Sequence, residues 1–247
     1  MERVVIPPPI EAPPSIAGLQ HCHSENFSRE QAQAVSPAKN PQDEHDYIAQ
    51  TLKESGYVIL PSPLSRSLLE GLYHHFRSLD DAAFKQGGIG RKEDYQVNSE
   101  VRRDEIHWLS PEHPSTQAYL DWMEQLRLAL NRSLFLALFQ YECHYAYYPI
   151  GGFYRKHWDA FKGGMNRMVS TVLYLNPDWQ PGDGGELYLY SDRDENERLE
   201  VITPDYGKLV IFLSEDFPHE VKPVCQPRYS IAGWFRVRPL QVVKVVS

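Results

Sequence analysis

Two segments decide how the C-terminal half of this chain folds: His-Trp-Asp at residues 157–159 and Arg-Tyr-Ser-Ile-Ala-Gly-Trp at residues 228–234. Both fit a β-strand, in which residues two apart point to the same face of a sheet. They lie in a region where the apolar periodicity changes from 3.6 to 2 residues after Gln140. We therefore expect the two segments to be strands that form two walls of one pocket.

Six strand-like runs follow Gln140, and they are separated by clusters of glycine, proline, aspartate and asparagine. The runs are residues 142–148, 153–158, 167–175, 186–190, 208–213 and 228–237. Short strands at near-regular spacing are typical of an all-β sandwich or barrel.

The residues before Gln140 show helical periodicity. The pattern predicts a helix that stops at Gly56, a strand over residues 57–60, a helix after the N-cap Ser65, and a helix from Ser115 to about Tyr141. We expect these helices to back the sheet.

Composition and periodicity together divide the chain into four parts. We expect a disordered Pro/Ser-rich tail over residues 1–42, helical support over 43–141 with a mobile glycine-rich loop at about 86–103, a β-rich core over 142–240, and a C-terminal tail over 241–247.

Charge and hydropathy exclude several classes of partner. The formal net charge of the 247 residues is −8, and no basic stripe is present, so nucleic-acid binding is not expected. No run approaches the roughly 20 apolar residues that span a membrane. The three cysteines form no Cys-x-x-Cys pair, and residues 1–10 lack the apolar core of a secretory signal, so we expect a cytoplasmic protein.

The chemistry concentrates on two histidines and one aspartate. His157 and Asp159 are two residues apart, so strand geometry places them on one face, and His219 lies far enough along the chain to come from another strand. Two imidazoles and one carboxylate on one side of a metal leave positions open, as Fe(II) oxygenases require. Zinc more often takes four ligands, or three with one water.

Arg228 adds a second function to this face. Strand alternation points it inward with Ser230 and Trp234, and no Asp or Glu on a neighbouring strand is an obvious partner. A planar guanidinium suits bidentate binding of a carboxylate. We therefore expect a ligand carboxylate at Arg228, with the Tyr174 hydroxyl as a second hydrogen-bond donor. A module that binds metal or ligand without turnover is the alternative from a different class.

Six motifs carry a resemblance to a known family: Tyr-Tyr-Pro (147–149), Gly-Phe-Tyr-Arg-Lys-His-Trp-Asp (152–159), Leu-Tyr-Leu-Asn (173–176), Gly-Gly-Glu-Leu (184–187), Pro-His-Glu-Val (218–221) and the segment 228–234. The chain resembles the 2-oxoglutarate- and Fe(II)-dependent dioxygenases over about residues 45–240. Within them it is most similar to the prolyl 4-hydroxylase branch, including the hypoxia-sensing prolyl hydroxylases and their bacterial relatives. The resemblance implies a mainly β double-stranded β-helix, or jelly roll, backed by helices.

The resemblance also implies roles for single residues. His157, Asp159 and His219 match the iron ligands, and Arg228 and Tyr174 match the residues that hold the far carboxylate of 2-oxoglutarate. The residues expected to line the cofactor and substrate pocket are Tyr148, Tyr154, Leu187, Ser230 and Trp234.

The implied reaction consumes O2 and 2-oxoglutarate, releases succinate and CO2, and hydroxylates a prolyl residue of a protein or peptide, with ascorbate as the reductant. An oxygenase of the same class that acts on a small molecule or on another side chain remains open at this point.

Overall fold

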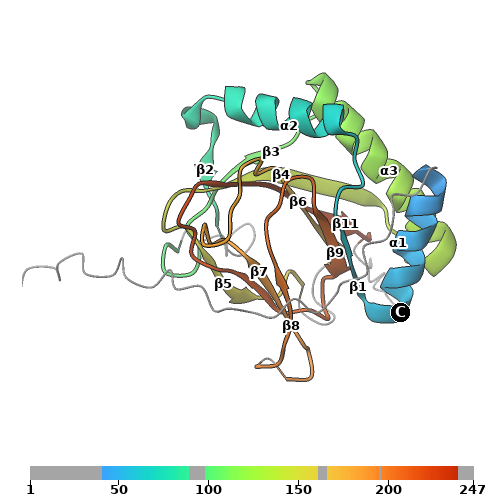
Figure 1. The fold of residues 1–247 in the computed structure, drawn as a ribbon. Coiled ribbons are helices and arrows are strands. Elements are labelled where there is room, and N and C mark those ends of the chain that lie inside the picture. The colour runs from blue at the N-terminus through green and yellow to red at the C-terminus, as the bar shows by residue number, and fades with distance from the viewer. Residues whose placement is uncertain (1–40, 89–97, 161–165, 195, 239–247) are drawn as a thin grey trace, which may run out of the picture.

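The fold is seen in a computed structural model that describes residues 41–88, 98–160, 166–194 and 196–238 (Figure 1). The predicted N-terminal tail up to residue 40, the predicted C-terminal tail and residues 89–97 of the predicted loop at 86–103 lie outside the described residues. None of the helices described here is both long and apolar enough to cross a membrane.

The described elements follow a helix-rich order and then a strand-rich order. The helices are α1 (Pro41–Ser55), α2 (Arg66–Ser78), a 3-10 turn (Asp81–Ala83) and α3 (Pro114–Leu134). The strands are β1 (Tyr57–Leu60), β2 (Lys85–Gln86), β3 (Glu105–Trp108), β4 (Gln140–Tyr148), β5 (Tyr154–His157), β6 (Arg167–Tyr174), β7 (Leu187–Tyr190), β8 (Arg198–Ile202), β9 (Leu209–Leu213), β10 (His219–Val221) and β11 (Arg228–Arg236).

The strands form two antiparallel sheets. The larger sheet has the order β1-β9-β6-β11-β4-β3-β2, and the smaller sheet has the order β5-β10-β7-β8. Figure 1 shows α1, α2 and α3 together on one side of the strands, with β5, β7 and β8 on the far side. The larger sheet is therefore sandwiched between helices and the smaller sheet, which confirms the predicted mainly β jelly roll with supporting helices.

The larger sheet also contains strands from residues 43–141, the segment that we expected to form the helical support. β1 pairs with β9, and β3 pairs with both β2 and β4. The position of residue 142 therefore marks a change of local periodicity and not an edge of the sheet.

Two of the predicted helix boundaries are confirmed, the end of α1 and the start of α2. Gly56 ends α1 with a left-handed φ of 78°, and the Ser65 side chain caps α2 by accepting a hydrogen bond from the Leu68 amide. The expected cap of α3 is wrong by two residues. The imidazole of His113 accepts from the Ser115 amide and takes the capping position.

The third helix ends at Leu134, so the expectation of a helix to about Tyr141 is also wrong. The Asn131 side chain donates to the Leu138 carbonyl and accepts from the Leu138 amide. Phe135 adopts a left-handed φ of 53°. These contacts bend the chain from the helix into β4. Residues 135–139 are all apolar, so periodicity alone continued the helix through this bend.

Strand β11 separates two apolar clusters. Ile231 and Phe235 belong to the cluster that packs against the helices. Arg228, Ser230 and Trp234 have the opposite parity in the same strand, and they are buried on the side of the smaller sheet. The predicted alternation of this strand is therefore confirmed, and it directs one face to the structural core and the other to the interior between the sheets.

His144 is a fully buried imidazole on β4. Its ring lies between Trp108 and Trp234, at centroid distances of 5.2 and 5.4 Å, and its Nδ1 bonds to the Tyr145 carbonyl. Burial lowers the pKa of His144 to about 4, and the charge of Arg102 acts in the same direction. The native state therefore holds this imidazole neutral.

We predict that Gly233→Ala destabilises the fold by about 3 kcal/mol, through overpacking of a closed core. A Cβ at this position would lie 2.2 Å from the Tyr141 hydroxyl and 2.7 Å from the Cys143 Cβ. Urea unfolding followed by circular dichroism measures the change. Gly182→Ala is the control, since nothing lies within 4 Å of its Cβ position and only its φ of 102° is strained, at a cost of roughly 1–2 kcal/mol. Equal losses in both variants would contradict the packing explanation.

We predict that the free energy of unfolding falls at acidic pH, and that His144→Gln makes this fall smaller. An unfolded chain protonates this histidine near pH 6.5, whereas the native state does so only at about 4. The unfolded state therefore binds more protons in this window. The stability contributed by the neutral imidazole is complete above pH 6.5 and falls as the pH drops to about 4, by up to roughly 3 kcal/mol. Urea midpoints at pH 7 and pH 4.5 test this, and an equal drop in both proteins would refute it.

Candidate metal centre and acid-binding pocket

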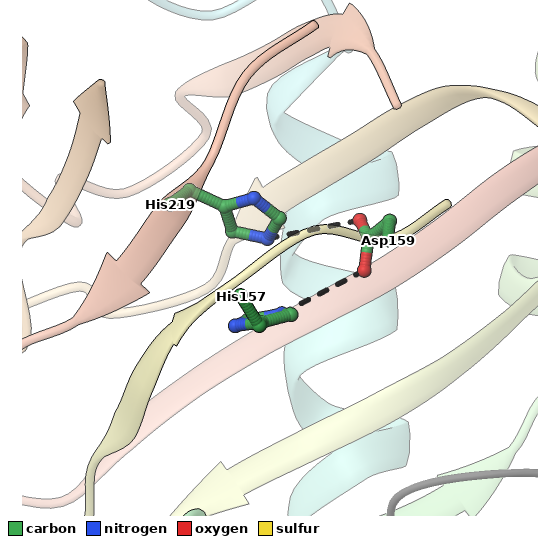
Figure 2. Close-up of side chains that lie close together, drawn as sticks. All are labelled: His157, Asp159 and His219. Carbon is green, nitrogen blue, oxygen red and sulfur yellow. Dashed lines mark ion pairs between the residues drawn. The ribbon is translucent and has the colours of Figure 1, made fainter. Parts of the chain in front are cut away.

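The side chains of His157, Asp159 and His219 converge between the two sheets. His219 opens β10 and lies directly opposite His157, the last residue of β5, in an antiparallel pair. One ligand atom from each of the three residues lies within 4.8 Å of the others. Figure 2 shows the carboxylate facing both imidazoles. The three residues that the sequence singled out are therefore brought together.

One detail of the prediction is wrong. We expected His157 and Asp159 to share a face of one strand, but β5 ends at His157, and Asp159 follows in irregular structure. The carboxylate still reaches the site because the chain turns there, so its position does not come from strand alternation.

Backbone carbonyls orient both imidazoles. Nδ1 of His157 lies 2.8 Å from the Arg155 carbonyl, and Nδ1 of His219 lies 3.1 Å from the Phe217 carbonyl. A carbonyl only accepts, so each Nδ1 carries the proton and each Nε2 keeps its lone pair. Both Nε2 atoms face Asp159, at 3.7 Å from Oδ1 and 3.7 Å from Oδ2 respectively. This is the tautomer in which imidazoles bind metals.

The charges of the three groups fit a cation. Burial by itself opposes ionisation of Asp159, yet the facing His219 and His157 lower the pKa of its carboxyl well below the usual range. Burial lowers the pKa of His219 to about 4, and His157 beside it acts in the same direction. The site therefore presents an ionised carboxylate and a neutral His219 imidazole at neutral pH. Two imidazoles with one carboxylate are the donor set of non-haem Fe(II) oxygenases, so these residues fit Fe(II).

Arg228 lies in the same interior and is only 3% exposed. Its guanidinium donates to the Gly185 carbonyl and the Ser230 hydroxyl, each at 3.0 Å. The rings of Tyr148 and Tyr174 flank it, at 4.8 and 4.9 Å from the ring centroids. No carboxylate within the described ranges pairs with it. A buried cation without a counter-charge costs several kcal/mol, so this pocket is suited to an acidic ligand.

The Tyr174 hydroxyl supports the same interpretation. It is buried and has no hydrogen-bond partner in the described part of the chain. Burial raises the pKa of Tyr174 to about 12, although Arg228 opposes the rise, so the hydroxyl keeps its proton. Arg228 and Tyr174 therefore offer several donors and no competing acid, which fits the distal carboxylate of a dicarboxylic acid such as 2-oxoglutarate.

Glycine makes room for the guanidinium. Gly185 has a left-handed φ of 76°, and a Cβ there would lie 2.8 Å from the Arg228 Cδ. The Gly-Gly-Glu-Leu motif therefore has a physical role, since it lets the backbone approach the arginine closely enough for its carbonyl to accept a hydrogen bond.

The other predicted site residues lie around these two centres. Tyr154 stacks on His157 with ring centroids 3.6 Å apart. Leu187 is buried in the apolar cluster between the sheets. Trp234 is buried, and its indole Nε1 has no partner among the described residues. Its ring carries the guanidinium of Arg167 at 3.5 Å.

Sequence reasoning missed three contributors to this interior. Ser170 donates to Asp159, Arg167 covers Trp234, and Glu142 pairs with Arg167 at 3.3 Å. Alternation of side chains along a strand was the available signal. It places Ser170 on the same face of β6 as Tyr174, and Glu142 on the same face of β4 as Tyr148. A single serine or ion pair on a strand nevertheless has no distinctive pattern.

Comparisons with known proteins agree with this geometry. The model of the 2OG-Fe(II) oxygenase superfamily matches residues 143–236. Human Egl nine homolog 1 is 26% identical over 200 residues, which cover 77% of this chain and 46% of the relative. The chain thus spans about half the length of the curated relatives it matches first.

Two solved structures are similar over most of the chain. A prolyl-4-hydroxylase from Pseudomonas putida is 38% identical, with a TM-score of 0.70, and the match covers 79% of this chain and 100% of the other. A prolyl hydroxylase from Trichoplax adhaerens, solved with a hypoxia inducible factor peptide fragment, is 28% identical, with a TM-score of 0.70 and coverage of 79% and 90%. The three converging side chains and these matches together show that the chain belongs to the 2OG-Fe(II) oxygenase superfamily, in its prolyl 4-hydroxylase branch.

Proposed function

We propose that this enzyme hydroxylates a prolyl residue of a protein or peptide, with Fe(II), 2-oxoglutarate and O2, and that it releases succinate and CO2 with ascorbate as the supporting reductant. The observation that carries the proposal is that Arg228 is buried in the same interior as the triad, with no carboxylate paired to it in the part of the chain that the structure describes. The relatives named prolyl hydroxylases, one of them solved with a peptide, support a prolyl substrate.

In this proposal His157, Asp159 and His219 hold the iron. The two Nε2 lone pairs and the ionised carboxylate face one another without a competing proton. Bound iron supplies the activation of O2 and the oxidation of both 2-oxoglutarate and the prolyl C–H bond. The chain supplies a neutral His219 imidazole, so metal binding at neutral pH does not first require loss of a proton from His219.

Arg228 and Tyr174 orient the co-substrate. The guanidinium binds the distal carboxylate of 2-oxoglutarate, and the Tyr174 hydroxyl donates to the same group. Both donors are buried, so these hydrogen bonds form with little competition from water. β6 connects the two centres, because Ser170 on this strand contacts Asp159 and Tyr174 on the same face lies beside Arg228. One strand therefore sets the spacing between metal and distal carboxylate.

Aromatic rings line the part of the pocket that we assign to the prolyl substrate. Tyr154 lies against His157, and Trp234 is buried on the β11 face that carries Arg228. The Tyr154 ring lies between His157 and Arg102, and Arg167 covers the Trp234 ring, so the two rings contribute as walls of the pocket and not as open faces. We assign Tyr154 and Trp234 to proline binding because the resemblance places them in the substrate pocket.

We predict that the purified protein with Fe(II) and ascorbate releases succinate from 2-oxoglutarate faster when proline-containing peptides are present. Succinate is measured by chromatography, and a gain of about 16 Da on the proline of the peptide is measured by mass spectrometry. A peptide with alanine in place of proline is the control. Succinate release that never responds to proline but responds to a small molecule would support the other substrate class instead.

We predict that different mutations impair metal binding and co-substrate binding. His219→Ala should abolish tight Mn²⁺ binding, because it removes one of three ligands, whereas Arg228→Gln should leave it within about twofold. Arg228→Gln should weaken 2-oxoglutarate binding to the Mn²⁺-loaded protein by about 10–100-fold, because charge-assisted hydrogen bonds contribute roughly 1.5–3 kcal/mol. Isothermal titration calorimetry measures both. Unchanged 2-oxoglutarate affinity in Arg228→Gln would place the distal carboxylate elsewhere.

A further inference from the structure

Asp159 differs from the two histidines in how the fold holds it. His157 and His219 belong to paired strands and face each other across the β5–β10 ladder. Asp159 lies beyond the end of β5, where no strand pairing positions it. A carboxylate in irregular structure needs another restraint if its oxygens are to face two imidazoles.

A hydroxyl from the larger sheet provides that restraint. The Ser170 Oγ donates to Asp159 Oδ2 at 2.7 Å, and the Ser214 Oγ lies 2.8 Å from the Ser170 Oγ. The ionised carboxylate only accepts, so the single hydroxyl proton of Ser170 points to Asp159. Ser214 must then donate to Ser170. The order of donation is Ser214 to Ser170 to Asp159, and each hydroxyl fixes the direction of the next.

Both serines are buried and come from neighbouring strands. Ser170 is 1% exposed on β6, and Ser214 is fully buried immediately after β9. β6 pairs with β9, with Ser170 opposite Phe212, and the Ser214 amide donates to the Met168 carbonyl at 3.0 Å. The two hydroxyls are thus fixed to the interior of the sheet, and water does not compete for the carboxylate oxygen that they hold.

We propose that Ser170 and Ser214 form a hydroxyl relay that positions Asp159 for metal binding. The relay engages Oδ2, which lies 3.7 Å from the His219 Nε2, while Oδ1 lies 3.7 Å from the His157 Nε2 and takes no part in the relay. The Ser170 hydroxyl thus limits rotation of the carboxylate, so that both oxygens stay turned towards the imidazoles that would hold the metal. The inference rests on the proposed function, and it makes Ser170 and Ser214 positioning residues and not ligands.

Replacing Ser170 removes the restraint without removing a ligand. In Ser170→Ala the buried carboxylate loses its hydroxyl donor and rotates more freely, so we expect Mn²⁺ affinity to fall about 10–100-fold, as is typical for outer partners of metal ligands. Ser170→Thr keeps the hydroxyl on a residue that favours strands and should bind within about threefold of the wild type. Ser214→Ala removes only the second donor and should lose a smaller factor.

Calorimetric titration of Mn²⁺ into the full chain and these three variants tests the relay. Ser191→Ala is the matched control, since Ser191 is also buried but lies just after β7, where its hydroxyl accepts from the Arg193 amide. Absorption of the Co²⁺-loaded proteins adds a second readout, because a change in how the carboxylate binds the metal changes the intensity of the visible bands. Ser170→Ala should change this spectrum, and Ser170→Thr should restore it.

The outcomes separate the relay from the proposed function. Wild-type protein that fails to bind Mn²⁺ overturns both. Wild-type binding with equal affinity and an equal Co²⁺ spectrum in Ser170→Ala overturns the relay and leaves the function standing. A loss in Ser191→Ala equal to that in Ser170→Ala shows a general effect of buried hydroxyls and also overturns the relay. If Ser170→Ala does not fold, the same comparisons between Ser214→Ala and the wild type decide the question.

Discussion

The pairing of β11 with β4 on one side and β6 on the other is the constraint on which the rest of the structure depends. Along its length β11 is hydrogen-bonded to both neighbours, so its side chains have only two directions available. Ile231 and Phe235 pack towards the helices, and Arg228 and Trp234 point between the sheets. One strand thus joins the structural core to the acid-binding pocket, and a slip of one residue would exchange the two faces.

The interior between the sheets combines groups that are unfavourable there without a ligand. Arg228 is a buried cation whose partners are a carbonyl, a hydroxyl and two ring faces, and beside it the Tyr174 hydroxyl finds no partner among the described residues. Aromatic faces stabilise a cation by roughly 0.5–2 kcal/mol each, which offsets only part of its desolvation. Under the proposed function, a metal and a dicarboxylate would supply the missing charges. The packing of the larger sheet against the helices therefore offsets the unfavourable free energy of this preorganised site.

Local patterns predicted most of the strands, two helix ends and the faces of β11, because each depends on residues close in sequence. The same patterns failed where a distant or irregular contact decided the outcome. Asn131 binds both polar groups of Leu138 and ends α3 within an apolar run. Asp159 lies past β5, so the two-residue spacing from His157 pointed to the right ligand for an incomplete reason.

The sequence by itself determined the chemical inventory, which is two histidines, one aspartate and one arginine, and the strand period assigned His157 and Arg228 to faces. That information is local, because strand alternation repeats every two residues. Only the tertiary structure decided which strands meet, and hence that His219 faces His157 across a ladder and that Ser170 and Ser214 hold the carboxylate. Pairing between strands tens of residues apart depends on the packing of both sheets together, and no short segment encodes it.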